Sequence, residues 1–316
     1  MARSINQYVN LYAFEDYLDS QRRNLPDIPE VSYLSNNVIR ILGGNPGQMQ
    51  LQGTNTYIVG TGSRRLLVDT GEGKPRWAQL ISQLLKEKGI TICGVLLTHW
   101  HGDHTGGSQD LIRLYPNLRD AVYKYAPDEG QQAISDGQTF AVEGATLRAL
   151  FTPGHSTDHV CFVLEEENAM FTGDNILGHG TTAVEKLGDY MDSLSKMQVQ
   201  QCQLGYPGHG AVVINLRHKL QLEVGQKKRR EYQVLSGLEK IRDTRQAAGL
   251  AQGRGSATSA ELVVEVFGQL PDDIGEAIFE PFMNELLMKL AGEKRVGFEL
   301  QGGRKRWFVM VGIGGK

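Results

Sequence analysis

Short apolar runs separated by glycine-containing turns fill the middle of the chain, a pattern typical of β-strands. The run Thr91–Leu97 is apolar throughout, which indicates a central strand buried on both faces of a sheet. The strands predicted in this way are Val38–Leu42, Asn55–Val59, Arg65–Val68, Thr91–Leu97, Val122–Tyr125, Gln138–Val142, Thr146–Thr152, His159–Leu164 and Met170–Asp174.

Helical periodicity appears first at Pro75–Lys88, where Trp77, Leu84 and Leu85 share one apolar face and Gly89 ends the element. Strands that alternate with such helices indicate a layered α/β arrangement. Further helices are predicted at Leu111–Tyr115, Tyr190–Met197, 216–245, Thr258–Phe267 and Pro271–Leu290, followed by a hairpin of Val296–Leu300 and Arg306–Val311.

This distribution of elements predicts three parts. Residues 1–36 form an N-terminal arm with one short helix at Gln7–Leu18, and residues 37–220 form the main domain. Residues 221–316 form a C-terminal helical domain, and Ala248–Ser256 is predicted to be an exposed, glycine-rich loop within it.

Composition adds constraints on the class of protein. The chain has 316 residues, 40% of them hydrophobic and 22% charged, which is ordinary for a globular protein. The net charge of -3 gives no electrostatic footprint for nucleic acid. The three cysteines Cys93, Cys161 and Cys202 do not make a disulfide framework, which favours a reducing compartment, and we expect a cytoplasmic protein. We expect neither a leader peptide nor a membrane segment, because no stretch approaches about 18 apolar residues.

Candidate chemistry gathers where the predicted strands end. The ends of several strands of an α/β sheet commonly converge on one site. Imidazole and carboxylate groups together suit a borderline cation such as zinc, iron, manganese or nickel. The residues are His99, His101, Asp103 and His104 directly after Thr91–Leu97, then His155, Asp174 and His209 at three later strand ends, and Asp69 at an earlier one.

The residue types alone leave alternatives for several of these positions. The histidines at 99–104 could be a polar loop, although three of the eight histidines in the chain lie there. Asp69 either faces the site or hydrogen-bonds its own turn. His159 is either a partner of the metal ligands or a solvent-exposed histidine at a strand start, and His179 either contacts substrate or is a polar loop residue.

The order His99, His101, Asp103, His104, His155, Asp174 and His209 resembles the metallo-β-lactamase superfamily. The resemblance implies an α+β fold, an αββα four-layer sandwich with the metals at one edge. It also implies two divalent metal ions, with zinc expected and manganese or iron as alternatives. His99, His101 and His155 resemble the ligands of the first metal, Asp103, His104 and His209 resemble those of the second, and Asp174 resembles the bridging carboxylate.

Within the superfamily the chain is similar to lactamase-β-2-like hydrolases, and more narrowly to fungal thioesterases of aromatic polyketide biosynthesis. True lactamases have a cysteine where this chain has Asp174, so the resemblance implies a thioester rather than a lactam as substrate. It further implies that Asp103 is also the catalytic base and that the partner is the acyl carrier protein of a polyketide synthase. The runs that carry it are residues 53–57, 69–73, 99–107, 152–159 and 175–181.

The C-terminal helices and hairpin resemble a small winged-helix-like domain. Arg304, Lys305 and Arg306 on the hairpin are too few to indicate a nucleic-acid site. We expect the domain either to shape the substrate pocket or to dock an acidic carrier protein through these basic residues. Two other functions stay open at this point. One is a metal-dependent endoribonuclease of the lactamase-β-2-like type, and the other is a nucleic-acid-binding protein whose lactamase-like domain is inert.

Overall fold

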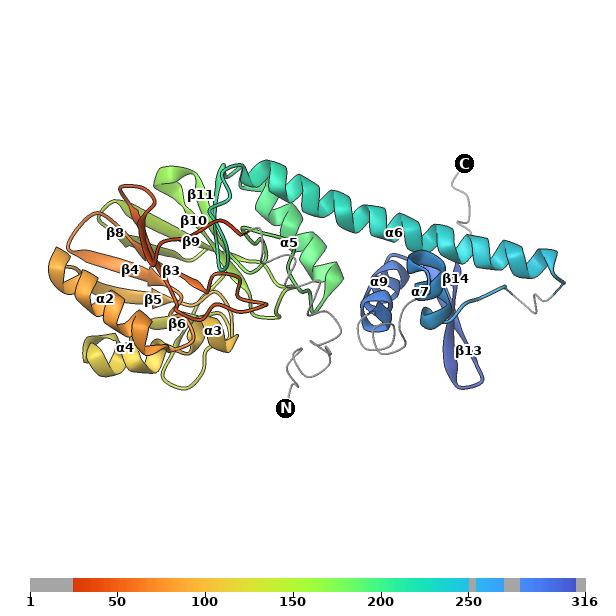
Figure 1. Ribbon diagram of the computed structural model, residues 1–316, viewed down its shortest axis with the longest axis horizontal. Coiled ribbons are helices and arrows are strands. Elements are labelled where there is room, and N and C mark those ends of the chain that lie inside the picture. The colour runs from red at the N-terminus through yellow and green to blue at the C-terminus, as the bar shows by residue number, and fades with distance from the viewer. Residues whose placement is uncertain (1–24, 250–253, 270–278, 311–316) are drawn as a thin grey trace. The chain divides into compact units, whose positions relative to one another are not determined.

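The computed structural model describes residues 25–249, 254–269 and 279–310 and divides into two compact units (Figure 1). The larger unit ends at Leu222, and the described part of the smaller unit begins at Glu223. Both positions lie in one long helix, α6 (Leu216–Ala247). The helix predicted at Gln7–Leu18 lies outside the described residues.

Two mixed sheets form the larger unit. Antiparallel hairpins build one side of the first sheet, whereas β4 to β7 pair in parallel. The first sheet contains, in spatial order, β1 (Val31–Tyr33), β2 (Val38–Leu42), β3 (Asn55–Val59), β4 (Arg64–Val68), β5 (Thr91–Leu96), β6 (Val122–Lys124) and β7 (Gln132–Ala133). The second contains β12 (Leu204–Pro207), β11 (Ala169–Gly173), β10 (Val160–Leu164), β9 (Ala145–Phe151) and β8 (Thr139–Val142).

Alternation along the strands of the first sheet creates two separate cores. Successive side chains of a strand point to opposite faces, so Tyr57 joins the core between the sheets while Ile58 joins the core beneath the helices. From the second sheet, Phe162 and Phe171 fill the same inter-sheet core. Full burial of such a side chain contributes about 1.5–3 kcal/mol.

Helices cover the outer faces of this sandwich. On the first sheet lie α2 (Pro75–Lys88), which buries Trp77 and Ile81, and α4 (Ser108–Leu114) (Figure 1). Against the second sheet lies α5 (Leu187–Val199), whose Ser193 Oγ donates to the carbonyl oxygen of Pro153 at 2.6 Å. The predicted αββα sandwich is therefore confirmed.

The sheet topology brings the candidate residues to one edge. Strands β4 and β5 are parallel neighbours, so Asp69 after β4 and His99 after β5 lie at the same end of the first sheet. Strands β11 and β12 are also parallel neighbours, so Asp174 after β11 and His209 after β12 lie at the same end of the second sheet. The short helix α3 (Gly102–Thr105) follows β5, and single turns of 3-10 helix occur at Pro116–Leu118 and Glu165–Glu167.

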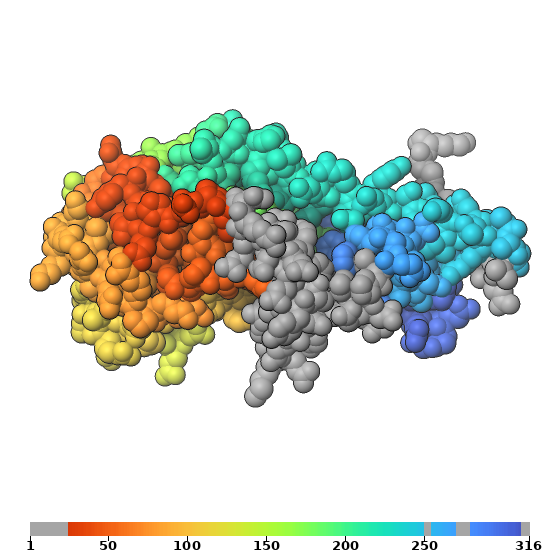
Figure 2. All heavy atoms as spheres, in the orientation of Figure 1, coloured from red at the N-terminus to blue at the C-terminus, as the bar shows by residue number. Residues whose placement is uncertain are grey.

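The described part of the smaller unit combines α6 from Glu223 onward with α7 (Ser259–Phe267), α9 (Glu280–Gly292) and the hairpin β13 (Val296–Gln301) and β14 (Arg304–Val309). The hairpin projects from the surface of this unit (Figure 2). Thr258 caps α7, and Glu261 completes a capping box. Of the helix predicted at Pro271–Leu290, the structure describes only the residues from Phe279 onward. Within them, helix α9 begins at Glu280.

The prediction of an exposed loop over Ala248–Ser256 is wrong at its end, where Ser256 is buried. The reason is that Ala257 pairs with Trp307 of β14, its N–H donating to the Trp307 carbonyl oxygen at 2.8 Å. Arg306 is held in the same place, because its Nη2 donates to Ser256 O at 2.7 Å and lies 2.9 Å from Glu261 Oε2. Of the predicted basic hairpin residues, Arg304 and Lys305 remain exposed.

Among the described residues, no helix has the length and apolar character that crossing a membrane requires.

Candidate metal centre

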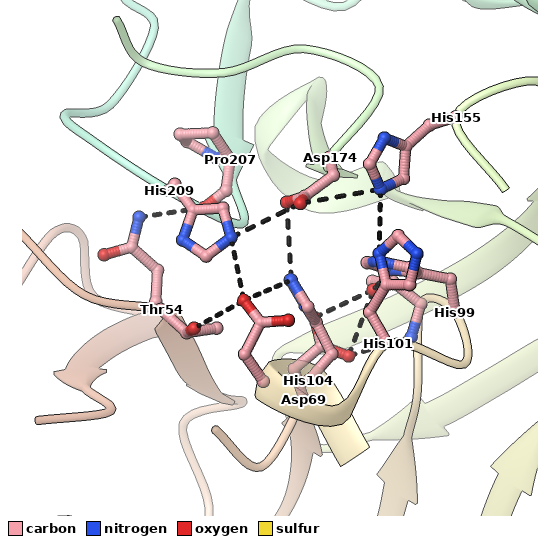
Figure 3. A network of polar contacts seen from close by, with 12 residues as sticks. Thr54, Asp69, His99, His101, His104, His155, Asp174, Pro207 and His209 are labelled. Atoms are coloured by element: carbon pink, nitrogen blue, oxygen red, sulfur yellow. Dashed lines mark hydrogen bonds and ion pairs between the residues drawn. The ribbon is translucent and has the colours of Figure 1, made fainter. Parts of the chain in front are cut away.

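Four side chains from three loops form the first ligand group (Figure 3). His101 Nδ1 lies 2.9 Å from His99 Nε2 and 3.1 Å from His155 Nε2. The fourth member, Asp174, places Oδ2 3.7 Å from His155 Nε2. The ligand atoms of this group all lie within 4.8 Å of one another, close enough to surround a single ion.

Asp103, His104 and His209 form a second group of the same compactness. Asp103 Oδ2 lies 3.2 Å from His209 Nε2 and 3.6 Å from His104 Nε2. Asp174 stands between the two groups, with Oδ1 3.4 Å from His104 Nε2 and Oδ2 3.3 Å from His209 Nε2. One carboxylate thus faces both sets of imidazoles (Figure 3).

Asp69 holds the ring of His104 from behind. His104 Nδ1 donates to Asp69 Oδ2 at 2.7 Å, which turns Nε2 toward the other ligands. The Thr98 N–H donates to Asp69 Oδ1 at 2.8 Å, and the Thr98 hydroxyl donates to Oδ2 at 2.9 Å. Of the two interpretations of Asp69, the geometry matches the one in which it faces the site.

Backbone carbonyls hold two further rings. His155 Nδ1 donates to Ala183 O at 2.8 Å, and His209 Nδ1 faces Gly53 O at 3.4 Å. A ring that donates through Nδ1 presents Nε2 as its lone-pair nitrogen when neutral. Such a second layer of contacts around metal ligands fixes their tautomer and orientation.

Two buried polar atoms in the centre have no hydrogen-bond partner, His104 Nε2 and Asp174 Oδ1. Leaving a buried polar atom unsatisfied costs about 1–3 kcal/mol. The two atoms lie 3.4 Å from each other where the two groups meet, and a cation bound there would satisfy them. The residues present therefore fit a divalent metal.

The acid–base properties of the first group also suit a cation. Burial lowers the pKa of His99 and, against the opposing effect of Asp174, that of His155. Burial and repulsion from His155 lower the pKa of His101 to about 4. These three rings are consequently neutral at pH 7, the form that binds metal.

The second group carries the balancing charges. Burial alone would raise the pKa of Asp103 and Asp174, but the nearby His104 and His209 hold both well below the usual range. Burial alone would lower the pKa of the two histidines, yet the carboxylates raise that of His104 well above its usual value and that of His209 to about 9. The carboxylates are therefore ionised, as metal ligands must be, whereas His104 and His209 hold protons that a binding metal would displace.

The remaining predicted residues lie outside the two groups. His159 is fully buried, so it is not the exposed strand-start histidine of the alternative interpretation. Its Nε2 accepts from the Asp174 N–H at 3.1 Å, which supports the backbone of that ligand. His179 is half-buried, and the N–H of its neighbour Gly178 donates to His209 O at 2.9 Å.

Sequence reasoning missed the role of glycine around the ligands. Gly208, directly before His209, does not have a left-handed φ, so its backbone conformation does not require a glycine. A glycine is needed because there is no room for a side chain: a Cβ at position 208 would lie 2.2 Å from Asp174 Oδ1 and 2.8 Å from His104 Cε1. By contrast Gly154, before His155, does have a φ of +135°, which favours glycine.

Sequence reasoning also missed Asn45, Thr54 and Thr182, which contact the ligands or their neighbours. The Thr182 hydroxyl lies 2.9 Å from His155 Nδ1. The only signal for Thr54 was its place in the run 53–57 that carried the resemblance, and Asn45 lies outside any motif.

Comparison with known proteins places this geometry in context. Residues 50–228, more than half of the chain, match the family model of the metallo-beta-lactamase superfamily. An atrochrysone carboxyl ACP thioesterase of Aspergillus fumigatus is 58% identical, over 97% of this chain and 98% of the relative. A lactamase-like protein, ptaB, of Pestalotiopsis fici is 55% identical over 98% and 97%.

A solved structure shares the fold at low sequence identity. The chain resembles a beta-lactamase domain protein from Burkholderia ambifaria with a TM-score of 0.68 and 17% identity, covering 90% of this chain and 95% of that one. At this identity the likeness concerns the fold alone.

Proposed function

The chain belongs to the metallo-beta-lactamase superfamily, and from that membership we propose that it is a metal-dependent thioesterase that releases an aromatic polyketide from an acyl carrier protein. The observation that carries the proposal is the 58% identity, over nearly the full length of both chains, to an atrochrysone carboxyl ACP thioesterase. The partner would be the carrier domain of a non-reducing polyketide synthase, and we place the reaction in the cytoplasm.

We propose that the cofactors are two divalent ions, zinc in preference to manganese or iron. His99, His101 and His155 would hold one ion, Asp103, His104 and His209 the other, and Asp174 would bridge them. The support is the compactness of both groups and the position of Asp174 between them. Zinc suits such mixed imidazole and carboxylate ligands.

Bound metals would supply the two functions of a hydrolytic centre, a water of lowered pKa and polarisation of the thioester carbonyl. The protein's own task is to place proton acceptors and keep them ionised. Asp103 Oδ2 is ionised at neutral pH, as a residue that is both ligand and acceptor of the water proton requires. Asp69 and His159 keep His104 and Asp174 in place while the proton moves.

The leaving group explains why no further acid is needed. Hydrolysis forms a C–O bond to the acyl carbon, breaks its C–S bond and releases the carrier thiolate. A thiol has a pKa of about 8.5, so the thiolate departs without full protonation. Asp174, at the position where lactamases have cysteine, is consistent with a thioester substrate.

Incubating the purified protein with a carrier domain loaded with an aromatic polyketide chain tests the proposal. We expect release of the free acid, measured by mass spectrometry of product and carrier. A chelator should reduce release to the uncatalysed rate, and added zinc should restore it. Single-stranded RNA and a β-lactam serve as competing substrates. Cleavage of RNA without release of the polyketide would refute the thioesterase.

The hairpin β13–β14 offers a docking surface for the carrier. Of its basic residues, Arg304 and Lys305 are exposed, whereas Arg306 is held by Ser256 and Glu261. We expect Arg304→Glu with Lys305→Glu to raise KM for the loaded carrier about tenfold, because complementary charge steers association. Metal content and hydrolysis of a small free thioester should stay unchanged. Equal KM values for the variant and the wild type would show that the hairpin is not part of the docking surface.

A further inference from the structure

Asn45 and Thr54 form a buried polar pair beside the second ligand group. Thr54 is 0% and Asn45 6% exposed, so their polar atoms must be satisfied within the protein. The Thr54 N–H donates to Asn45 Oδ1 at 2.9 Å, and Asn45 Nδ2 donates to Thr54 Oγ1 at 3.0 Å. The Thr54 hydroxyl is in turn 3.2 Å from Asp103 Oδ2.

These contacts determine which way the Thr54 hydroxyl points. The backbone N–H of Thr54 can only donate, so the Asn45 oxygen must face it, and the amide cannot be reversed. Asn45 Nδ2 then faces Thr54 Oγ1, which must accept. The hydroxyl hydrogen is left for Asp103 Oδ2, which accepts it.

Residues 53–55 also contact His209, another member of the second ligand group. Gly53 O faces His209 Nδ1 at 3.4 Å, and Thr54 forms an antiparallel bridge with His209. Asn55 Nδ2 donates to the carbonyl oxygens of Pro207 and Gly210, both at 2.9 Å. Residues 53–55 therefore contact two ligands, Asp103 and His209, that are far apart in the sequence.

We propose that Asn45 and Thr54 are positioning residues for the second metal, with Asn45 directing the Thr54 hydroxyl at Asp103 Oδ2. The hydroxyl fixes which carboxylate oxygen faces His209 and keeps it there when the metal is absent. This proposal rests on the metal centre of the proposed function but not on its substrate. Contacts of this kind around metal ligands typically change metal affinity or activity by about 10–100-fold.

Substitution of Thr54 tests the proposal through metal affinity. Thr54→Val keeps the shape and removes the hydroxyl, whereas Thr54→Ser keeps the hydroxyl. The zinc content of dialysed protein and competition with a chromophoric chelator measure each of the two metal equivalents. We expect Thr54→Val to weaken one equivalent about 10–100-fold and leave the other unchanged, and Thr54→Ser to restore it. Asn45→Ala should weaken the same equivalent.

Thr56 provides a matched control on the same strand. It is also fully buried, and its hydroxyl donates to Ile41 O and accepts from Trp77 Nε1, both at 2.9 Å, away from the ligands. Thr56→Val should lower the unfolding temperature while both metal equivalents keep wild-type affinity. The proposal is overturned if Thr54→Val binds both equivalents as the wild type does, or if Thr56→Val weakens the same equivalent equally. If Asn45→Ala binds both metal equivalents with wild-type affinity, Asn45 does not act as a positioning residue.

Because these measurements need no substrate, they are independent of the thioesterase assay. A protein that fails to release polyketide but loses one metal equivalent in Thr54→Val supports the positioning pair and refutes only the proposed reaction.

Discussion

Asp174→Asn is expected to remove both metals and almost all hydrolytic activity. The substitution keeps the size of the side chain but removes the charge that lies 3.3 Å from His209 Nε2 and 3.7 Å from His155 Nε2. It thereby withdraws a ligand from both groups at once. Metal chemistry at such a centre is worth several kcal/mol, and a loss of about 4 kcal/mol corresponds to about a thousandfold in rate.

Metal analysis of the dialysed variant and product release from the loaded carrier measure the two effects. Asp192→Asn is the matched control, because Asp192 is an exposed carboxylate on α5 and should leave metal content and rate unchanged. A variant that retains two metals, or stays within tenfold of the wild-type rate, would contradict the bridging role of Asp174.

Gly208→Ala is expected to disable the second ligand group without changing any ligand. The added Cβ would lie 2.2 Å from Asp174 Oδ1, 2.8 Å from His104 Cε1 and 3.2 Å from the carbonyl carbon of Gly173. These atoms are too close for ordinary packing, and a shift of the backbone would strain the hydrogen bond that Gly208 N–H donates to Gly173 O at 2.8 Å. The carboxylate and the imidazole must therefore move apart.

We expect this variant to bind one metal equivalent at least 100-fold more weakly, at the upper end of what changes around metal ligands cause, with a comparable loss of kcat. Gly188→Ala adds the same methyl group at the start of α5, where nothing lies within 4 Å, and should behave as the wild type. Wild-type metal binding in Gly208→Ala would show that the loop after β12 relaxes freely.

The fold was predictable where local pattern and burial agree. The continuous run Thr91–Leu97 predicts a central strand, and β5 is indeed flanked by β4 and β6. The two-residue strand Gln132–Ala133 is too short and too exposed to leave a pattern in the sequence. The end of the loop before α7 was mispredicted, because the pairing of Ala257 with Trp307 joins residues far apart in the chain.

The candidate site likewise contains residues that the sequence suggests and residues that it does not. The seven proposed ligands stand in short motifs, so residue types alone suggest them. Asn45 and Thr54 do not, since an asparagine and a threonine gain a role only when folding brings them next to Asp103. The need for a glycine at position 208 is equally invisible in the sequence, because the contact that excludes a side chain there is made with Asp174 and His104.

During translation the seven proposed ligands leave the ribosome as one early group, followed by His155, Asp174 and His209 in turn. His99, His101, Asp103 and His104 emerge together, whereas His209 follows His104 by 105 residues. At about 5–20 residues per second this interval lasts about 5–20 s. The early donors have no bridging carboxylate until Asp174 is made, and no complete second group until β12 pairs with β11 and brings His209 to the edge. Tight metal binding by the nascent chain would thus indicate that β12 has paired with β11 in the second sheet.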